Sequence, residues 1–266
     1  MSAENSPLGK RVDAPTELDA SVLFPVPRRD SRIERGIGED LPFDGYDLWN
    51  CYEVSWLNNK GIPQVAMARI QYYCSTENIV ESKSLKLFLG SFNNTRVGSA
   101  ADVEGLISNS LCDVVGGECK VELILPDAWT TGFSAPDGVC IDDADPDLNA
   151  QILFGTDKIK ETLHSNLLRS LCPVTGQPDW GTVVISYEGP QIDRATLLGF
   201  IISLRDEAGF HESLTEMIFM EIMEKGKPEK LNVTCNYTRR GGVDINPVRH
   251  SFGFEPKSEF QRLVRQ

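Results

Sequence analysis

One order of secondary structure is predicted twice along this chain, and that repetition limits the folds it can adopt. Alternating apolar and polar residues indicate strands, and apolar residues spaced by three or four positions indicate helices. In the first half the predicted order is strand, strand, helix, helix, strand, at residues 46–57, 64–74, 81–92, 102–115 and 119–125. Leucine at every second position from Leu85 also fits a strand, but the helical spacing of Leu85, Phe88 and Phe92 is favoured.

The second half repeats this order, although the sequence similarity between the halves is negligible. Its elements are expected at residues 158–168, 182–187, 194–205, 211–225 and 231–237. A repeated element order of this kind indicates a duplicated α+β unit. We therefore predict two domains, residues 1–140 and residues 141–266.

The segments outside these elements are interpreted as connections. Residues 127–149 are rich in Asp, Pro and Gly, which is typical of a linker. Their four clustered aspartates could bind calcium, but the spacing is not that of an EF-hand loop, and a solvated linker is preferred. The first forty or so residues are charged and contain several prolines, so they are expected to form an extended arm.

The charge and the cysteines exclude several classes of protein. The net charge of -13 argues against a uniformly basic surface for nucleic acid. No run of about 18 apolar residues predicts a membrane span, and the N-terminus lacks the pattern of a signal peptide. The seven cysteines are scattered without a CxxC pair, which favours free thiols in a reducing compartment. The expected location is the cytoplasm.

A short loop stiffened by two prolines carries the residues with the clearest chemistry. Cys172 and Asp179 lie in the sequence LCPVTGQPDW, and Phe210-His211-Glu212 adds an imidazole and a second carboxylate. A nucleophilic thiol must ionise and needs a nearby acid for the group it creates, so this combination suggests a covalent cysteine enzyme. Each residue also has a structural interpretation, namely a buried loop thiol and two residues at a helix N-terminus.

Other catalytic motifs are either absent from the sequence or match it poorly. A zinc site could use Cys172, His211 or Cys235, but the chain has three histidines and no ligand pair at zinc-finger spacing. There is no G-x-S-x-G elbow, no Walker A motif and no G-x-G-x-x-G motif.

Two basic clusters are candidates for phosphate contacts in an otherwise acidic protein. Glu81-Ser82-Lys83-Ser84-Leu85-Lys86 places a carboxylate before two lysines at the start of a predicted helix. Arg239-Arg240-Gly241-Gly242 joins two basic side chains to flexible backbone. A solvated helix face and a hairpin turn are the structural alternatives.

These residues resemble the signatures of a known family, the QueF nitrile reductases, which act on 7-cyano-7-deazaguanine. The segments from Glu81 to Leu89 and from Leu171 to Gly181 are specific in combination. The resemblance extends over most of the chain through further segments, namely Leu23–Arg28, Ser55–Leu57 with Lys60-Gly61, Phe210–Glu212 and Arg239–Pro247. Gly90 and Ser213 depart from the family pattern, at positions that should not carry the chemistry.

The resemblance implies a fold and a reaction. The fold would be two tandem tunnelling-fold (T-fold) units, with antiparallel sheets and helices on one face. The site would lie between the two halves of the chain, and the protein would be a homodimer. Cys172 would attack the nitrile to form a thioimide intermediate, Asp179 would act as general acid-base, and His211 would assist proton transfer or hydride delivery. Two NADPH would reduce the adduct to the 7-aminomethyl product in queuosine biosynthesis, a tRNA modification pathway, with no metal.

The resemblance also implies the binding residues. Glu81 and Glu212, with Ser82, would recognise the two adjacent N–H donors of the deazaguanine edge. Lys83, Lys86, Arg239 and Arg240 would contact the NADPH phosphates. The substrate would be the free base, so neither nucleic acid nor membrane is an expected partner. Two alternatives stay open, a GTP cyclohydrolase-like enzyme with Cys and His metal ligands, and a non-catalytic tunnelling-fold protein that binds purines or pterins.

Overall fold

The chain folds into a mixture of helices and antiparallel sheets that divides into two compact units. The computed structural model describes residues 13–130, 132–148, 151–256 and 262–266. Unit 1 contains described residues up to 39, residues 46–130 and residues 239–244. Unit 2 contains residues 40–45 and the described parts of 132–238 and 245–266. The predicted α+β class with antiparallel sheets is confirmed.

Unit 1 is built on a three-stranded antiparallel sheet in the order β5-β3-β2. Its strands are β2 (Asp44–Leu57), β3 (Pro63–Tyr73) and β5 (Cys119–Ile124). The register of β2 and β3 runs from Tyr46 opposite Tyr73 to Leu57 opposite Pro63, which confirms the predicted hairpin. Every second residue of β3 is buried, at Ala66, Ala68, Ile70 and Tyr72, because this face packs against the core.

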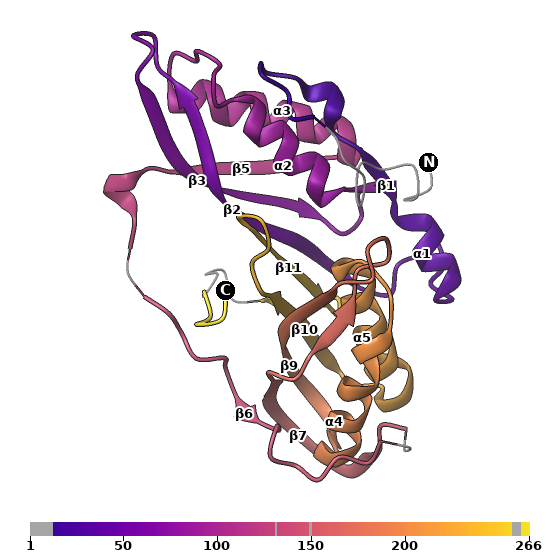
Figure 1. The fold of residues 1–266 in the computed structure, drawn as a ribbon. Helices are drawn as coiled ribbons and strands as arrows, with labels where there is room; N and C mark the ends of the chain where they lie inside the picture. The colour runs from indigo at the N-terminus through magenta and orange to yellow at the C-terminus, as the bar shows by residue number, and fades with distance from the viewer. Residues whose placement is uncertain (1–12, 131, 149–150, 257–261) are drawn as a thin grey trace. The chain divides into compact units, whose positions relative to one another are not determined.

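Two helices, α2 (Ser82–Ser91) and α3 (Ala100–Val115), lie on one face of that sheet (Figure 1). The buried side of α3 consists of Val103, Ile107, Leu111 and Val115, all fully buried at helical spacing. Ser99 caps the start of α3, and Gly116 ends it with a left-handed backbone (φ 72°). The structure therefore resolves the ambiguity at residues 81–92 in favour of the predicted helix.

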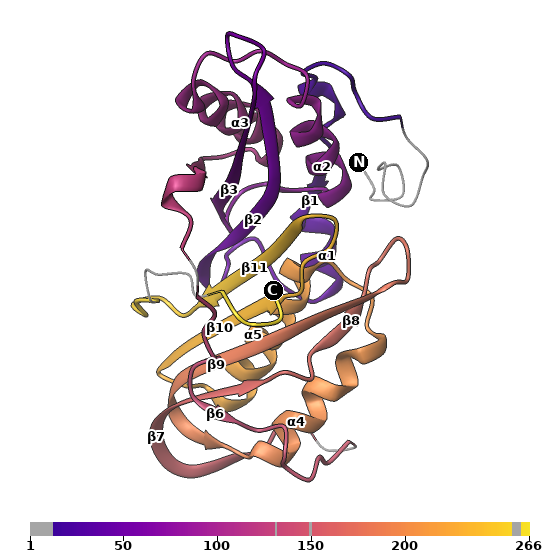
Figure 2. The ribbon, with the colours of Figure 1, turned by 60° about the vertical axis from the view of Figure 1, so that its left-hand side comes forward.

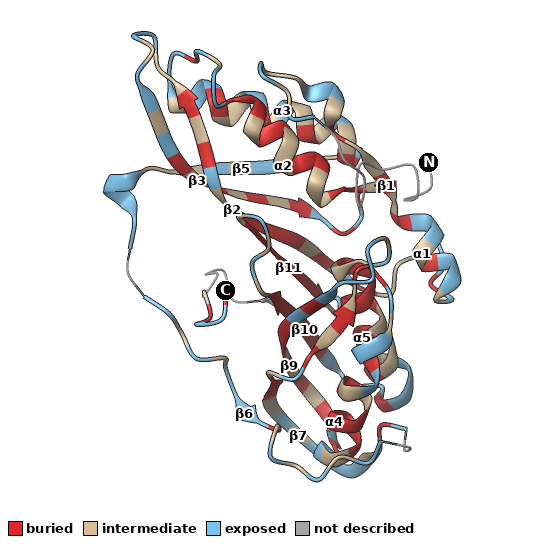
Figure 3. Ribbon diagram, viewed as in Figure 1, coloured by how far each residue is buried: buried red, intermediate tan, exposed pale blue. Residues whose placement is uncertain are grey.

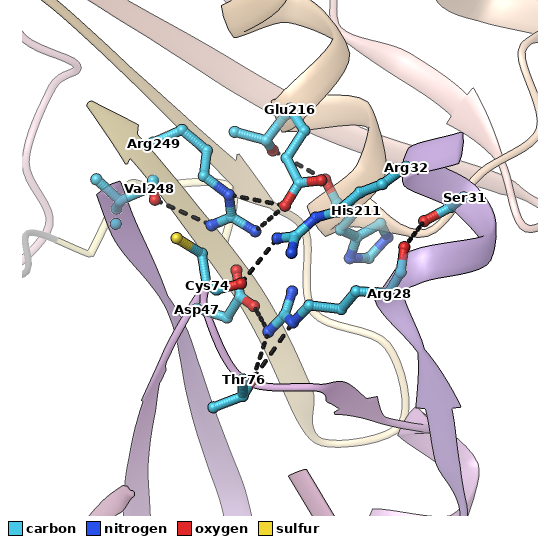
Figure 4. Close-up of polar contacts among 12 residues, drawn as sticks. Arg28, Ser31, Arg32, Asp47, Cys74, Thr76, His211, Glu216, Val248 and Arg249 are labelled. Atoms are coloured by element: carbon cyan, nitrogen blue, oxygen red, sulfur yellow. Dashed lines mark hydrogen bonds and ion pairs between the residues drawn. The ribbon is translucent and has the colours of Figure 1, made fainter. Parts of the chain in front are cut away.

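The expectation of an extended N-terminal arm is wrong for much of the described part. β1 (Pro25–Pro27) pairs with β4 (Asn78–Val80), and α1 (Arg28–Glu34) follows directly. Arg28 is buried and forms an ion pair with Asp47 at 2.5 Å, and it also donates to Thr76 (Figure 4). Arg32 donates to the carbonyl of Cys74 at 2.7 Å. Residues 25–34, although rich in proline and charge, therefore pack against the rest of unit 1. Residues 1–12 of the predicted arm lie outside the described part.

Unit 2 is built on a larger sheet in the order β11-β10-β9-β7-β6, with β8 paired to β9. Its strands are β6 (Val139–Cys140), β7 (Phe154–Ser165), β8 (Arg169–Leu171), β9 (Pro178–Ile192), β10 (Lys230–Tyr237) and β11 (Val243–His250). All pairs are antiparallel except the short parallel pair β6-β7. The helices α4 (Arg194–Ser203) and α5 (His211–Gly226) lie on one face (Figure 2).

Helix α5 is anchored to unit 2 at a buried ion pair. The guanidinium of Arg249 on β11 donates twice to one oxygen of Glu216, at 3.1 and 2.9 Å, and once to the carbonyl of Val248 (Figure 4). Both side chains are almost fully buried. Removing one partner would leave an uncompensated buried charge, so this pair ties the middle of α5 to β11. Figure 3 shows the buried face of α5 directed toward the sheet.

Several strands of unit 2 differ from the sequence prediction. Short β6 lies inside the predicted linker, and β7 covers Phe154–Ser165 in place of the expected 158–168. β8 and β11 were not predicted, and β9 begins at Pro178, earlier than the expected residue 182. β8 has only three residues, which is too short for an alternation pattern to appear. β11 contains Pro247, and a proline inside a run argues against a strand.

The predicted linker is mostly irregular between Pro126–Ala128, a short 3₁₀ turn, and β6. Within it Asp142 accepts hydrogen bonds from Ser165 and Asn166, so this aspartate stabilises a turn. In the described residues no group of three or more His, Cys, Asp and Glu side chains is arranged to hold a metal ion. None of the helices in the same residues is long and apolar enough to cross a membrane.

Candidate active site

Cys172 stands at the end of β8, where the chain turns back toward β9. Its backbone N–H donates to the carbonyl of Gln177 at 2.9 Å, and its carbonyl accepts from the N–H of Gly176 at 3.0 Å. Gly176 takes a left-handed conformation (φ 64°), which closes the loop without steric cost. The thiol is 8% exposed, so it is shielded from bulk water. The two backbone hydrogen bonds hold the Cys172 backbone independently of its side chain.

Asp179 lies on the same hairpin, near Cys172. In the β8-β9 register Ser170 is opposite Asp179 and Leu171 is opposite Pro178, and the hydrogen bond from Cys172 to Gln177 continues this pairing. Ser170 and Asp179 lie opposite each other and therefore on the same face. Cys172 is two positions after Ser170 and shares that face, so Cys172 and Asp179 are diagonal neighbours. The carboxylate is 6% exposed. The structure thus brings the predicted nucleophile and the predicted acid to one face of the hairpin.

His211 is the first residue of α5, and the segment before the helix is tied to the same hairpin. Leu171 donates to the carbonyl of Glu207 at 2.9 Å, and Gly209 donates back to Leu171 at 3.0 Å. The imidazole Nε2 lies 3.3 Å from a carboxylate oxygen of Asp179, with both side chains largely buried. His211 and Asp179 are thus in contact, and all three predicted catalytic residues belong to unit 2.

Tyr237 completes this cluster, and the sequence analysis did not single it out as a site residue. Its ring stacks on the imidazole of His211, with centroids 3.7 Å apart and planes at 7°. Burial raises the pKa of the Tyr237 phenol well above its ordinary value, and the nearby charges of Asp179 and Glu212 raise it further. In the sequence Tyr237 is one of four alternating apolar residues on a strand, a pattern that indicates only a core position.

Glu212 follows His211 in the first turn of α5 and is 3% exposed. The N-terminal end of a helix favours a negative charge, which helps to keep a buried carboxylate there. Its neighbour Ser213, one of the two departures from the family pattern, is also buried. Cys235, a candidate in the zinc alternative, is fully buried on β10, and burial raises the pKa of its thiol to about 12.

Glu81 belongs to unit 1, where it caps the helix that follows it. One carboxylate oxygen accepts from the N–H of Lys83 at 2.6 Å and the other from the N–H of Ser84 at 2.9 Å. The Ser82 hydroxyl lies 3.4 Å from the first of these oxygens. An ionised carboxylate offers roughly four acceptor positions, so this capping leaves capacity for a further donor. The side chain is fully buried, a structural role that the sequence analysis did not foresee.

The basic candidates also belong to unit 1. Arg240 and Val243 exchange backbone hydrogen bonds around Gly241 and Gly242, which have φ of 57° and 73°. A hairpin turn with positive φ at both central residues favours glycine. A Cβ atom placed on Gly241 would stand 3.3 Å from Nζ of Lys86. The structure therefore brings the Lys86 side chain into close contact with the turn that carries Arg239 and Arg240.

Arg239 is held by an aromatic ring of the same unit. Its guanidinium lies 4.6 Å from the ring centroid of Tyr52, and the Tyr52 hydroxyl donates to buried Asp244 at 2.5 Å. Such cation–π contacts orient a guanidinium while leaving its donors able to bind an anion. Lys83, in the first turn of α2, is partly exposed.

A shielded thiol, a buried carboxyl group and an imidazole thus lie on one hairpin and the helix end tied to it. Residues 15–123 match a family described as nitrile reductase, 7-cyano-7-deazaguanine-reductase N-term, and residues 178–253 match one described as QueF-like protein. The chain belongs to the QueF family of nitrile reductases.

Several relatives of this chain are named NADPH-dependent 7-cyano-7-deazaguanine reductase. The relative from Desulfotalea psychrophila is 49% identical over 91% of both chains, and that from Burkholderia cenocepacia is 45% identical over the full length of both. Among solved structures, the archaeosine synthase QueF-Like in the apo form is 20% identical and covers 40% of this chain and 99% of its own, with a TM-score of 0.28.

Proposed function

We propose that this chain reduces 7-cyano-7-deazaguanine to 7-aminomethyl-7-deazaguanine with two NADPH, through a thioimide formed on Cys172. The chain is an NADPH-dependent nitrile reductase of queuosine biosynthesis, in keeping with relatives that match it over 91% and 100% of their length. The observation that carries the mechanism is the face shared by Cys172 and Asp179, with His211 3.3 Å from that acid.

The first step adds the thiol across the nitrile. The sulfur of Cys172 forms a bond to the nitrile carbon, one C≡N π bond breaks, and the nitrogen takes a proton. Asp179 is the proposed donor of that proton, and the proton lost by the thiol restores the acid, so the step is balanced. Shielding of the thiol and the acid from bulk water strengthens this transfer and limits hydrolysis of the adduct.

The later steps also need protons at defined places. NADPH supplies the hydride for each of the two reductions. After the first reduction the bond between carbon and Cys172 sulfur breaks, and an imine remains for the second. His211 is proposed to deliver protons to the nitrogen through its contact with Asp179. Lys83, Lys86, Arg239 and Arg240 are proposed to hold the phosphates, because Lys86 lies against the glycine turn that carries the two arginines.

The base is proposed to be recognised by carboxylates. Two adjacent N–H donors match the two oxygens of one carboxylate, and Glu81 and Glu212 are the proposed acceptors, with Ser82 beside Glu81. A purine edge without those donors would leave buried acceptors unpaired, so it would be rejected. Glu81 keeps its helix-capping bonds in this role, since they occupy only part of its acceptor capacity.

Replacing Glu212 by glutamine is expected to weaken substrate binding while leaving the helix intact. A hydrogen bond to a charged group contributes about 1.5–3 kcal/mol, so the dissociation constant should rise about ten- to a hundredfold. Calorimetric titration on a Cys172→Ala background measures binding without adduct formation. Glu224→Gln, an exposed glutamate on the same helix, is the matched control. Equal affinity in both variants would remove Glu212 from recognition.

The assembly and the domains are also proposals. Each unit has an antiparallel sheet with two helices on one face, which supports two tandem tunnelling-fold units divided near residue 140. The chain is proposed to act as a homodimer on the free base in the cytoplasm, without nucleic acid or membrane as a partner. The excess of acidic residues supports the absence of a nucleic-acid partner.

The proposed mechanism is tested by intact-protein mass spectrometry with 7-cyano-7-deazaguanine and no NADPH. We expect a mass gain of one substrate per chain, which disappears when NADPH is added. Cys140→Ser, which removes the exposed thiol, should keep the adduct. Folded wild-type protein that gains no mass with a reduced thiol would contradict covalent catalysis.

A further inference from the structure

In unit 2 the ring of Tyr237 stacks on the imidazole of His211, and this stack has no part in the proposed mechanism. The two rings lie 3.7 Å apart and are nearly parallel, and Tyr237 is fully buried. We propose that Tyr237 is a positioning residue, which fixes the plane of the His211 imidazole so that Nε2 faces Asp179. This inference rests on the proposed function, because it assigns a task to the histidine of that site.

Two different restraints are needed to hold an imidazole. The contact from Nε2 to Asp179, at 3.3 Å, sets the direction of the ring within its own plane. It leaves the ring able to tilt about that contact, and Nδ1 has no hydrogen-bond partner among the described residues to prevent this. A flat aromatic face against the imidazole removes the tilt. Tyr237 therefore supplies the restraint that the carboxylate cannot.

Tyr237 is itself firmly held, which a positioning residue requires. It is the last residue of β10 and pairs with Gly181 on β9. A Cβ atom on Gly181 would stand 3.3 Å from Cδ1 of Tyr237, so the glycine leaves the room that the ring occupies. The carbonyl of Tyr237 also accepts from the side chain of Gln266 at 3.2 Å. Backbone pairing and close packing together fix the ring.

The flat face of the Tyr237 ring, and not its hydroxyl, is the part that holds the imidazole. Burial raises the pKa of the phenol well above its ordinary value, with the charges of Asp179 and Glu212 adding to the effect, so the hydroxyl stays protonated at neutral pH. A phenylalanine ring offers the same face without the hydroxyl, whereas a leucine fills part of the space without a flat surface. The two substitutions therefore separate stacking from hydroxyl chemistry.

The first test uses proton NMR of the histidine rings, which the chain's three histidines make tractable. The signals lost in His211→Gln identify the His211 ring. In the wild-type protein they should be shifted upfield by the ring current of Tyr237, stay upfield in Tyr237→Phe, and move toward the free-histidine position in Tyr237→Leu. Unshifted His211 signals in the folded wild-type protein would overturn the proposal without any Tyr237 variant.

The second test is kinetic. Loss of precise orientation near the reacting atoms can cost about a hundredfold in rate, so Tyr237→Leu should lower kcat by about ten- to a hundredfold with KM for the nitrile little changed. Tyr237→Phe should recover most of that loss. Tyr187→Leu, which removes an equally buried ring from β9, controls for general loosening and should keep kcat.

The outcomes separate this proposal from the proposed function. If the wild-type protein forms the Cys172 adduct but Tyr237→Leu keeps full kcat, the positioning role is wrong and the covalent mechanism stands. If the wild-type protein forms no adduct, the mechanism fails whatever Tyr237 does. Equal losses of kcat in Tyr237→Leu and Tyr187→Leu would show a structural role alone and would also overturn the proposal.

Discussion

Replacing Cys172 by alanine is expected to abolish turnover while the protein stays folded. The sulfur forms the bond on which every later step depends, so the loss in kcat should be on the order of 10⁴-fold or more. Folding should tolerate the change, because the loop is held by backbone hydrogen bonds of Cys172 with Gln177 and Gly176. Oxidation of NADPH in the presence of the nitrile measures the rate, and circular dichroism measures the fold.

The buried thiols of Cys51, Cys119 and Cys235 are poorly suited to replace Cys172. Burial raises the pKa of the Cys119 thiol to about 12 and that of the Cys51 thiol still higher, so both are protonated at neutral pH. A protonated thiol is a poor nucleophile. Cys140→Ser is the matched control, since it removes an exposed thiol of the same unit. Turnover by folded Cys172→Ala above a trace would disprove nucleophilic catalysis by this residue.

Much of the fold follows from periodicity, because long elements bury one face. The alternation in β3 and the helical spacing in α3 each extend over many residues, and both elements have the predicted type and nearly the predicted ends. Short or proline-containing elements cannot be predicted from apolar periodicity. β8 is only three residues long, yet it sets the register that places Cys172 beside Asp179.

The sequence also predicts the candidate site only in part, because it shows residue type and not tertiary contacts. Cys172, Asp179 and His211 carry chemistry that is visible in residue type, and the structure brings these three together. Tyr237 carries none, since its role depends on a ring placed face to face with another by tertiary structure. Likewise, the capping bonds of Glu81 depend on where α2 begins, which a sequence pattern locates only to within a few residues.

Asp179→Asn is expected to slow formation of the Cys172 adduct by about 10²- to 10⁴-fold, the range of general acid–base catalysis. Asparagine keeps the shape of the side chain and can still accept a hydrogen bond from Nε2 of His211, so the stacked ring should stay in place. It cannot give a proton to the nitrile nitrogen. The loss should therefore fall on the chemical step and spare substrate binding.

A time course of intact-protein mass after mixing with the nitrile measures this rate directly, without NADPH and without the later steps. Asp206→Asn, the same change at an exposed carboxylate of unit 2, controls for lost charge and should react at the wild-type rate. If Asp179→Asn forms the adduct at the rate of this control, the proton must come from another group. His211, 3.3 Å away, would then be the acid, and His211→Gln would show the loss instead.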